Sequence, residues 1–224
     1  YLLEEHSPLP RLYQDLFRYS RDSVLVRVLL NWAEKKGARY AELNYGSNSR
    51  RRNFWARLGF VENGVDEWGE PLMIRPPTDK DTIKIEVLAD SEDGQLRKLE
   101  DSFLKEIGEQ TLTEEKQKQL VEAISDGRIT FFFAKRGYRA IGMCSVVKCF
   151  STFTCTDTGV FEDFYVEPAF RNKGIAWMLG HAAQEWSHEQ ELSSLTVCCA
   201  SCDEEMYRHL GFDILLGKTY AKIN

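Results

Sequence analysis

Residues 171–176, Arg-Asn-Lys-Gly-Ile-Ala, join an apolar and aromatic segment to a long helical pattern without a linker between them. A strand that leads directly into a helix leaves the first N–H groups of that helix unpaired. These groups and the helix dipole bind anions such as phosphates. Gly174 lets a ligand approach the backbone, and Arg171 and Lys173 add positive charge. The spacing therefore predicts a pyrophosphate-binding turn, and a purely structural turn is the alternative.

Two other places carry side chains suited to proton transfer or substrate binding. Tyr207 lies in the helical segment CDEEMYRHL, where a packed aromatic without a chemical role is the alternative to a proton donor. Glu162 and Asp163 are adjacent in FEDFYV, so regular strand geometry predicts opposite faces, with Glu162 on the face of Phe164 and Val166. A carboxylate paired with a surface Lys or Arg is the alternative reading of Glu162.

The six cysteines all lie in the second half of the chain. Cys199 and Cys202 have CxxC spacing, but neither a second such pair nor a His pair accompanies them. We therefore expect reduced, mostly buried thiols and no metal site.

The elements that must position these residues can be read from residues 83–224. The order is strand, two helices, three strands, helix, strand, helix and a final strand or pair of strands, which predicts a mixed α/β domain of about 140 residues. The predicted segments are 83–89, 93–107, 113–127, 128–137, 138–153, 161–166 with the helix after it, 193–200, 202–210 and 212–223.

The first half contains part of the same pattern. Residues 31–60 align with residues 185–212, so that Trp32 matches Trp186, Trp55 matches Tyr207, and both segments end in Leu-Gly-Phe. Such self-similarity predicts an internal repeat. We expect a half-repeat over residues 1–76, a proline-containing linker over 77–82 and a complete domain over 83–224.

The aromatic strand, the turn Arg-Asn-Lys-Gly-Ile-Ala, the helix after it and the segment YRHLGF together resemble the GCN5-related N-acetyltransferase (GNAT) superfamily. That family has Arg/Gln-x-x-Gly-x-Gly/Ala after its fourth strand and Tyr-x-x-Leu-Gly-Phe in the following helix. The resemblance covers residues 83–224 in full order and residues 15–76 in part. It implies a splayed mixed sheet flanked by helices, preceded here by a partial GNAT-like half-domain.

The resemblance also implies a co-substrate and an activity. Acetyl-CoA would place its pyrophosphate on the turn and its pantetheine along the fourth strand. The residues implied to bind it are Phe164, Tyr165, Val166, Arg171, Asn172, Lys173, Gly174, Ile175 and Ala176. A backbone N–H near Tyr165 or Val166 would polarise the thioester carbonyl.

Tyr207 stands where the family places the general acid that protonates the departing thiolate. The strand FEDFYV resembles the Glu-Asp-Phe-aromatic-Val strand of polyamine acetyltransferases, in which the acidic pair helps to hold the cationic substrate. Glu162 and Asp163 are therefore the expected acceptor-binding residues, and Glu162 is also the candidate to relay the proton of the amine.

The resemblance predicts an N-acetyltransferase that moves an acetyl group to a primary amine by direct attack. A catalytically silent acyl-CoA-binding or protein-interaction module is the alternative from another class, and transfer of a longer acyl group or to a hydroxyl is a third reading. The acceptor, a small-molecule amine or a protein amine, stays open.

The first half departs from the family pattern. Its counterpart of the turn, FRYSRDS at residues 17–23, has no glycine, and Trp55 stands in place of the tyrosine, although Asn48 matches an Asn that the family often places near the cofactor. We expect a degenerate, two-stranded remnant over residues 15–76 that does not bind CoA. It would dock against the second domain or against a second copy of the chain in a homodimer.

The net charge of the chain limits the classes of partner that are expected. The chain has a formal net charge of −6, and residues 83–224 hold 16 basic and 23 acidic residues, a net charge of −7. Such a surface disfavours nucleic acid and suits cationic partners. Because no apolar run approaches the roughly 20 residues of a membrane helix and the first ten residues are unlike a signal peptide, we expect a cytoplasmic protein without a membrane partner.

Overall fold

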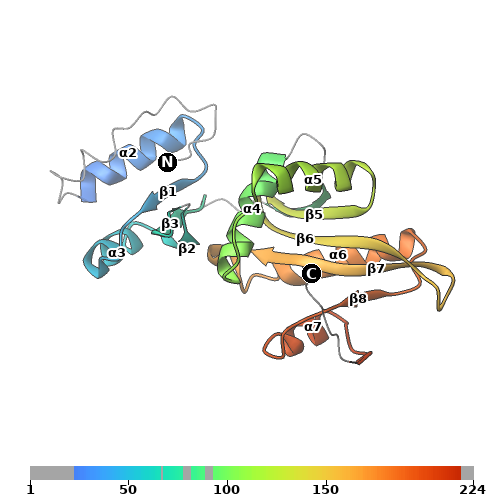
Figure 1. Cartoon of the computed structure of the whole chain (residues 1–224). Helices are drawn as coiled ribbons and strands as arrows, with labels where there is room; N and C mark the ends of the chain where they lie inside the picture. Colours follow the sequence, from blue (N-terminus) through green and yellow to red (C-terminus); the bar gives the residue numbers. More distant parts are fainter. Residues whose placement is uncertain (1–22, 67, 78–81, 89–92, 218–224) are drawn as a thin grey trace. The chain divides into compact units, whose positions relative to one another are not determined.

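The computed structural model describes residues 23–66, 68–77, 82–88 and 93–217 (Figure 1). The chain divides into two compact units, Tyr1–Lys80 and Asp81–Asn224. Each unit has its own sheet, with three strands in the first and five in the second among the described residues.

The second unit is built on a mixed sheet in the order β4-β5-β6-β7-β8. Its strands are β4 (Ile83–Val87), β5 (Ile129–Arg136), β6 (Arg139–Ser151), β7 (Thr156–Val166) and β8 (Leu195–Val197). Neighbours are antiparallel up to β7, and β8 is parallel to β7. This arrangement confirms the predicted mixed α/β fold.

Helices cover both faces of this sheet. They are α4 (Asp93–Glu106), α5 (Glu114–Ser125), α6 (Ile175–Glu189) and α7 (Glu204–His209), with a short 3-10 turn, η2 (Pro168–Phe170), before α6. In β6, Met143 belongs to the cluster beneath α4, whereas the thiol of Cys144 donates to the carbonyl of Leu179 in α6, at 3.7 Å. Because neighbouring strand residues face opposite sides, α4 and α6 lie on opposite faces of the sheet.

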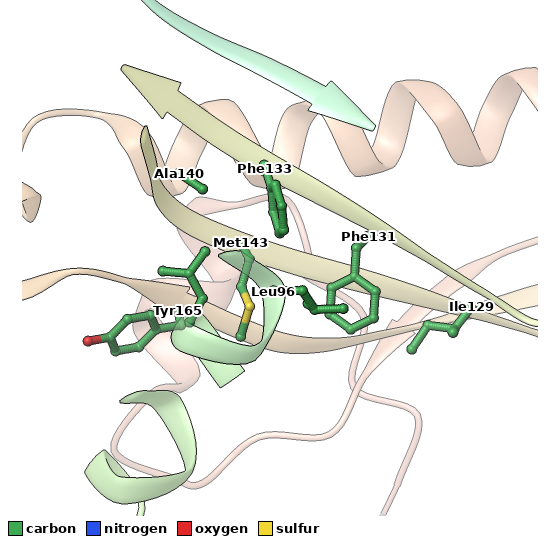
Figure 2. Close-up of a cluster of buried hydrophobic side chains, with 8 residues drawn as sticks. Leu96, Ile129, Phe131, Phe133, Ala140, Met143 and Tyr165 are labelled. Atoms are coloured by element: carbon green, nitrogen blue, oxygen red, sulfur yellow. The ribbon is translucent and has the colours of Figure 1, made fainter. Parts of the chain in front are cut away.

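The larger core lies between α4 and the sheet (Figure 2). It contains Leu96, Leu99, Ile129, Phe131, Phe133, Ala140, Met143 and Tyr165. Phe132, between two of these residues, points to the other face, where its ring meets Trp186 of α6 at 5.7 Å. The run of three phenylalanines therefore supplies apolar side chains to both layers, which makes β5 a central strand.

The first unit consists of α2 (Ser23–Lys35), β1 (Ala41–Asn44), α3 (Ser49–Ala56), β2 (Val61–Val65) and β3 (Pro71–Arg75). The strand order is β1-β3-β2, with antiparallel pairs, so the prediction of a two-stranded remnant is wrong. The sequence did not indicate the third strand, β2, because VENGV does not alternate between apolar and polar residues and contains Gly64. In the structure, Gly64 has φ +77° and the register of β2 is irregular. The segment 17–22 of the predicted turn FRYSRDS lies outside the described residues.

A cluster of buried side chains fills the interior of the first unit: Leu30, Tyr45, Trp55, Leu58, Phe60 and Met73. Trp55 belongs to this cluster, and Asn48 caps α3 by accepting the N–H groups of Arg50 and Arg51 at 3.0 and 3.2 Å.

The Leu-Gly-Phe segments of the two units have the same local geometry. Gly59 and Gly211 both have positive φ, +87° and +93°. The N–H that follows each glycine bonds back five residues, from Phe60 to the carbonyl of Trp55 at 3.2 Å and from Phe212 to the carbonyl of Tyr207 at 3.0 Å. Glycine is the residue that accepts this left-handed helix ending.

Two sequence expectations need correction. No strand is present at residues 212–217, the described part of the predicted final strand; Ile214, Leu215 and Leu216 are exposed there, so apolar character did not signal pairing. The cysteines, all within the described ranges, are free thiols, but only Cys144 is buried, because the others lie at strand ends and in loops. Among the described helices, none is long and apolar enough to cross a membrane.

Candidate active site

The candidate site begins where β8 separates from β7. Within the described part of the chain, β8 pairs only with Gly159–Phe161, which leaves the following residues of β7 without a partner on that side. Glu167 donates its N–H to the carbonyl of Ile141 in β6, at 2.9 Å. Because backbone groups alternate between the two edges of an antiparallel strand, those of Val166 point to the open edge, and those of Tyr165 point to β6. Val166 is thus the residue with an N–H directed into the gap.

A β-bulge interrupts β7 within this open segment. Ser145 of β6 lies opposite Glu162, and Met143 lies opposite Tyr165, so β7 holds one residue more than β6 over this stretch. Asp163 has φ +49°, a value that strand residues do not adopt, and marks the bulge.

The bulge changes which side chains share a face. The ring of Phe164 lies 5.4 Å from that of Phe161, three residues earlier, so both face the same side of the sheet. The Asp163 carboxylate accepts the hydroxyl of Ser145 at 2.8 Å, on the face of Glu162. The predictions that Glu162 shares a face with Phe164 and opposes Asp163 are therefore wrong, because they assumed a regular strand.

The turn after β7 leads into α6 through two residues with left-handed backbone. Asn172 has φ +59°, and Gly174, the N-cap of α6, has φ +80°. No side chain of the described residues caps this helix, so the N–H groups of its first turn, beginning at Ile175, have neither an intrahelical nor a side-chain acceptor. A Cβ built on Gly174 would meet no atom within 4 Å. The N-terminus of α6 is thus open to an anion.

The two basic residues of the turn are held by the chain itself. Arg171 donates to the carbonyl of Val166 at 2.8 Å and to Glu106 of α4 at 2.6 Å, and its guanidinium lies 5.6 Å from the centre of the Tyr165 ring. Lys173 donates to the carbonyl of Ala169 at 2.9 Å. These contacts fix the path of the turn, while both side chains keep positive charge close to it.

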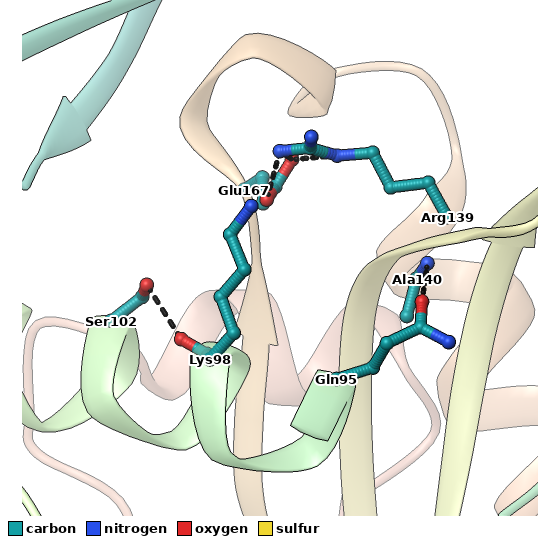
Figure 3. Close-up of polar contacts among 6 residues, drawn as sticks. All are labelled: Gln95, Lys98, Ser102, Arg139, Ala140 and Glu167. Atoms are coloured by element: carbon teal, nitrogen blue, oxygen red, sulfur yellow. Dashed lines mark hydrogen bonds and ion pairs between the residues drawn. The ribbon is translucent and has the colours of Figure 1, made fainter. Parts of the chain in front are cut away.

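A buried ion pair anchors the start of the turn (Figure 3). Glu167, the residue after β7, accepts two hydrogen bonds from one nitrogen of the Arg139 guanidinium, at 2.8 and 3.1 Å, and one from Nε at 3.3 Å. Lys98 of α4 extends toward the same carboxylate. Because both paired side chains are almost fully buried, removal of either one would disrupt a charge pair in the interior.

Tyr207 comes to the open edge from α7. Its ring centroid lies 6.4 Å from that of Phe161 and 6.1 Å from that of Phe164, on the face of the sheet opposite the carboxylates. Burial, and then the neighbouring Cys199, raise the pKa of Tyr207 to about 12. The phenol therefore keeps its proton at neutral pH.

The carboxylates on the other face perturb one another. Burial raises the pKa of Asp163, although the hydrogen bond from Ser145 acts in the opposite direction. Partial burial, and then the charge of Asp163, raise the pKa of Glu162, which is exposed. These two residues, adjacent in sequence, thus form an exposed and a partly buried carboxylate on the same face.

Sequence reasoning missed Glu100 of α4. It is 5% exposed, and its Oε1 has no hydrogen-bond partner within the described ranges. Burial, and then the charge of Asp163, raise its pKa to about 8. The sequence did hold a signal, because Glu100 occupies a position of the apolar stripe formed by Leu96, Leu99 and Phe103.

The open strand edge and the open helix N-terminus fit the two polar parts of acetyl-CoA. A pantetheine has amide groups that can pair with a strand edge, and a pyrophosphate suits uncapped N–H groups at a helix start. The absence of any neighbour around the Cβ position of Gly174 leaves room for close approach. Within the described residues, no group of three or more His, Cys, Asp or Glu side chains is arranged to hold a metal ion.

Comparisons with solved structures agree with this fold. A predicted acetyltransferase with acetyl-CoA from Clostridium acetobutylicum is 14% identical, with 64% of this chain and 96% of that chain covered and a TM-score of 0.55. An aminoglycoside acetyltransferase from an uncultured soil metagenomic sample is 16% identical, with 63% and 97% covered and a TM-score of 0.56. Glucosamine-6-phosphate N-acetyltransferase from Arabidopsis thaliana is 17% identical, with 64% and 100% covered and a TM-score of 0.53.

At these identities the likeness shows the fold. A search of the curated proteins found no match. The model of the Acetyltransferase (GNAT) family matches residues 95–212, more than half of the chain, including β5 to β8, the turn and α7. The chain therefore belongs to the Acetyltransferase (GNAT) family.

Proposed function

We propose that this chain is an N-acetyltransferase that moves an acetyl group from acetyl-CoA to a primary amine by direct attack. One observation carries the proposal: the unpaired stretch of β7 has an uncapped helix N-terminus at its end, a protonated phenol on one face and ionisable carboxylates on the other. The helix N-terminus suits the pyrophosphate of the co-substrate, and acyl transfer to an amine uses a proton donor for the leaving group and a group that accepts the proton of the amine.

Different residues would bind the pantetheine and the pyrophosphate of acetyl-CoA. The backbone of Phe164 and Val166 would take the pantetheine at the open edge, with Tyr165, whose backbone groups point to β6, between them. Arg171, Asn172, Lys173, Gly174, Ile175 and Ala176 would take the pyrophosphate. The direction of the Val166 backbone favours its N–H, over that of Tyr165, as the donor to the thioester carbonyl. Arg171 would act mainly by holding the turn to α4 through Glu106.

When bound, the co-substrate supplies the acetyl group as a thioester. Tyr207 would donate its proton to the departing sulfur, a role for which its raised pKa keeps it in the acid form. Glu162 and Asp163 would hold the cationic acceptor on the opposite face, and their shared face supports a joint role. Glu162, as the exposed member, is the first contact for an incoming ammonium.

The acceptor is proposed to be a cationic amine. Two structural neighbours are named for aminoglycoside and glucosamine-6-phosphate acetylation, and both of those acceptors are small amines. The net charge of −7 over residues 83–224 favours cations. A catalytically silent acyl-CoA-binding module is the competing function, and the phenol and carboxylates on opposite faces of the open edge favour the enzyme.

The test is a screen of primary amines against labelled acetyl-CoA. The panel should contain short aliphatic diamines, aminoglycosides, amino sugars, and peptides with a free lysine or N-terminus. We expect label transfer to at least one class of aliphatic amine. Acetyl-CoA binding by calorimetry without transfer to any amine would instead establish the silent module, and the same panel with hydroxyl acceptors would reveal an O-acyltransferase.

A further inference from the structure

Glu100 is a carboxyl group buried at a position where an apolar side chain would be expected. It replaces an apolar side chain in the stripe of α4 that packs on the sheet, between Leu99 and Phe103. It is 5% exposed, and its Oε1 is sealed from solvent without a hydrogen-bond partner among the described residues. A buried carboxyl with an unsatisfied oxygen costs stability, so its presence calls for a role.

The charges that act on Glu100 are themselves carboxylates. They are Asp163, at the bulge of β7, and Asp101 on α4. The cationic side chains on this face have other contacts: Arg139 pairs with Glu167, Lys98 extends toward the same Glu167, and Arg97 bonds Gln117 of α5 at 2.6 Å. Arg97 also lies 3.8 Å from Asp101. Glu162, Asp163 and Glu100 thus form a graded series from exposed to buried.

We propose that Glu100 holds the proton that the acceptor ammonium must lose before it attacks, and that Asp163 is the carboxylate through which the proton reaches it. The inference deepens the proposed acetyltransferase function and rests on it. Glu100 acts through Asp163 and does not touch the substrate. The acceptors that need such a proton acceptor are aliphatic amines, which are ammonium ions at neutral pH.

The resting state of this pair already stores one proton. Burial, and then the charge of Asp163, hold the pKa of Glu100 near 8, so Glu100 is protonated at pH 7. An ammonium bound at Glu162 and Asp163 places a positive charge near Glu100 and favours its ionised form. Binding of the acceptor therefore releases the proton of Glu100 to solvent and leaves Glu100 ionised, ready to accept a proton.

The transfer then balances. The ammonium gives one proton to Asp163, from which it passes to Glu100, and the neutral nitrogen attacks the thioester carbonyl carbon. As the C–N bond forms and the C–S bond breaks, Tyr207 donates its proton to the sulfur, and the second proton of the nitrogen restores the phenol. The sum is an ammonium and a thioester converted to an amide, a thiol and the one proton released on binding.

The first arm of the test measures the proton on Glu100 without any substrate. A folded-state pKa above the unfolded value means that the folded chain binds more protons, so stability is lost as pH rises from about 4.5 to about 8. We expect the urea midpoint of the wild-type chain to fall across this range, and part of this fall to vanish in Glu100→Gln. Glu122→Gln, an exposed change of the same charge on α5, should retain the wild-type slope.

The second arm measures turnover with an aliphatic amine that the panel identifies. At pH 7, Glu100→Gln should lower kcat by roughly tenfold or more, the lower range for loss of proton transfer, while the KM for acetyl-CoA is unchanged. The deficit should shrink toward pH 9.5, because more of the amine then arrives neutral and needs no proton acceptor. Glu162→Gln should instead raise the KM of the amine.

The arms separate this inference from the proposed function. Equal pH slopes in wild type and Glu100→Gln would show that Glu100 stores no proton and would overturn the inference, whether or not an amine is acetylated. A kcat deficit that is the same at every pH would show a merely structural role. If Glu100→Gln does not fold, Glu100→Leu, which continues the apolar stripe, takes its place in both arms with the same expected outcomes.

Discussion

Asp163 occupies the position where β7 gains one residue over β6, and this single insertion separates the chemistry of the two faces. Without it, Phe164 would share a face with Glu162; with it, Phe164 joins Phe161 beside Tyr207. The phenol thus lies beside aromatic rings and is partly buried, and the carboxylates collect on the opposite face. In the proposed reaction, a phenol and carboxylates on opposite faces of one open strand edge would act on the leaving group and on the acceptor separately.

Tyr207→Phe is the prediction at this scale. The substitution keeps the ring contacts with Phe161 and Phe164 and removes the proton donor. We expect turnover to drop by roughly 10²-fold or more while the affinity for acetyl-CoA stays constant, a loss typical of general acid catalysis. The measurement is steady-state kinetics with calorimetric binding as the control. Unchanged turnover would assign Tyr207 to packing alone.

At the scale of elements, the turn between β7 and α6 is held by contacts with the rest of the unit, while the N-terminus of α6 is open to a ligand. The ion pair of Arg139 with Glu167 and the contacts of Arg171 with Val166 and Glu106 hold the turn from within. Within the described residues, no side chain caps the first N–H groups of α6. A prearranged turn of this kind binds an anion without an ordering cost at the moment of binding.

Gly174→Asp tests this element. The change puts a negative charge at the helix N-cap and a Cβ into the open space, at φ +80°. We expect at least about a tenfold loss of CoA affinity, equivalent to about 1.4 kcal/mol, because the new carboxylate repels the pyrophosphate. The readout is calorimetry.

Gly127→Asp is the matched control for that variant. Gly127 follows α5, has φ +68° and is equally open, so the substitution introduces the same residue with similar backbone strain away from the turn. Both variants should lose similar stability, and only Gly174→Asp should lose affinity. Equal CoA affinity in the two folded variants would place the pyrophosphate elsewhere.

On the scale of the whole molecule, the chain consists of a unit that contains the match to the Acetyltransferase (GNAT) family and a smaller unit before it. We propose that the first unit is a degenerate half-repeat. Its order α2-β1-α3 parallels α6-β8-α7, and the shared turn at Gly59 and Gly211 supports a common origin of the two segments. Leu25, Val28 and Trp32 form an exposed apolar stripe on α2.

The number of bound CoA molecules tests this division. We expect one CoA per chain, because in the first unit Asn48 is committed to capping α3 and Trp55 is packed in the core in place of a proton-donating tyrosine. Calorimetry of the full chain should give a stoichiometry near one, and Gly174→Asp should remove or weaken that single site. A second site that survives Gly174→Asp would mean that the first unit binds CoA as a working domain.

The sequence by itself determined the element order of the second unit, the turn at Gly174 and the place of Tyr207, because local spacing and glycine conformation carry these features. It also determined the family through motifs that are short and contiguous. It did not determine strand β2, with its irregular sequence VENGV, or the absence of a strand at residues 212–217. Strand formation depends on a neighbouring strand, which the local sequence pattern does not identify.

Only the tertiary structure decided the chemistry of the carboxylates. At Asp163, β7 holds one residue more than the paired stretch of β6, and this bulge reverses the faces that regular alternation predicts. Glu100 is remote in sequence from Asp163, and its raised pKa arises from burial between α4 and the sheet and from a charge brought close by the fold. Electrostatic coupling depends on distance and burial in space, which no local stretch of sequence specifies.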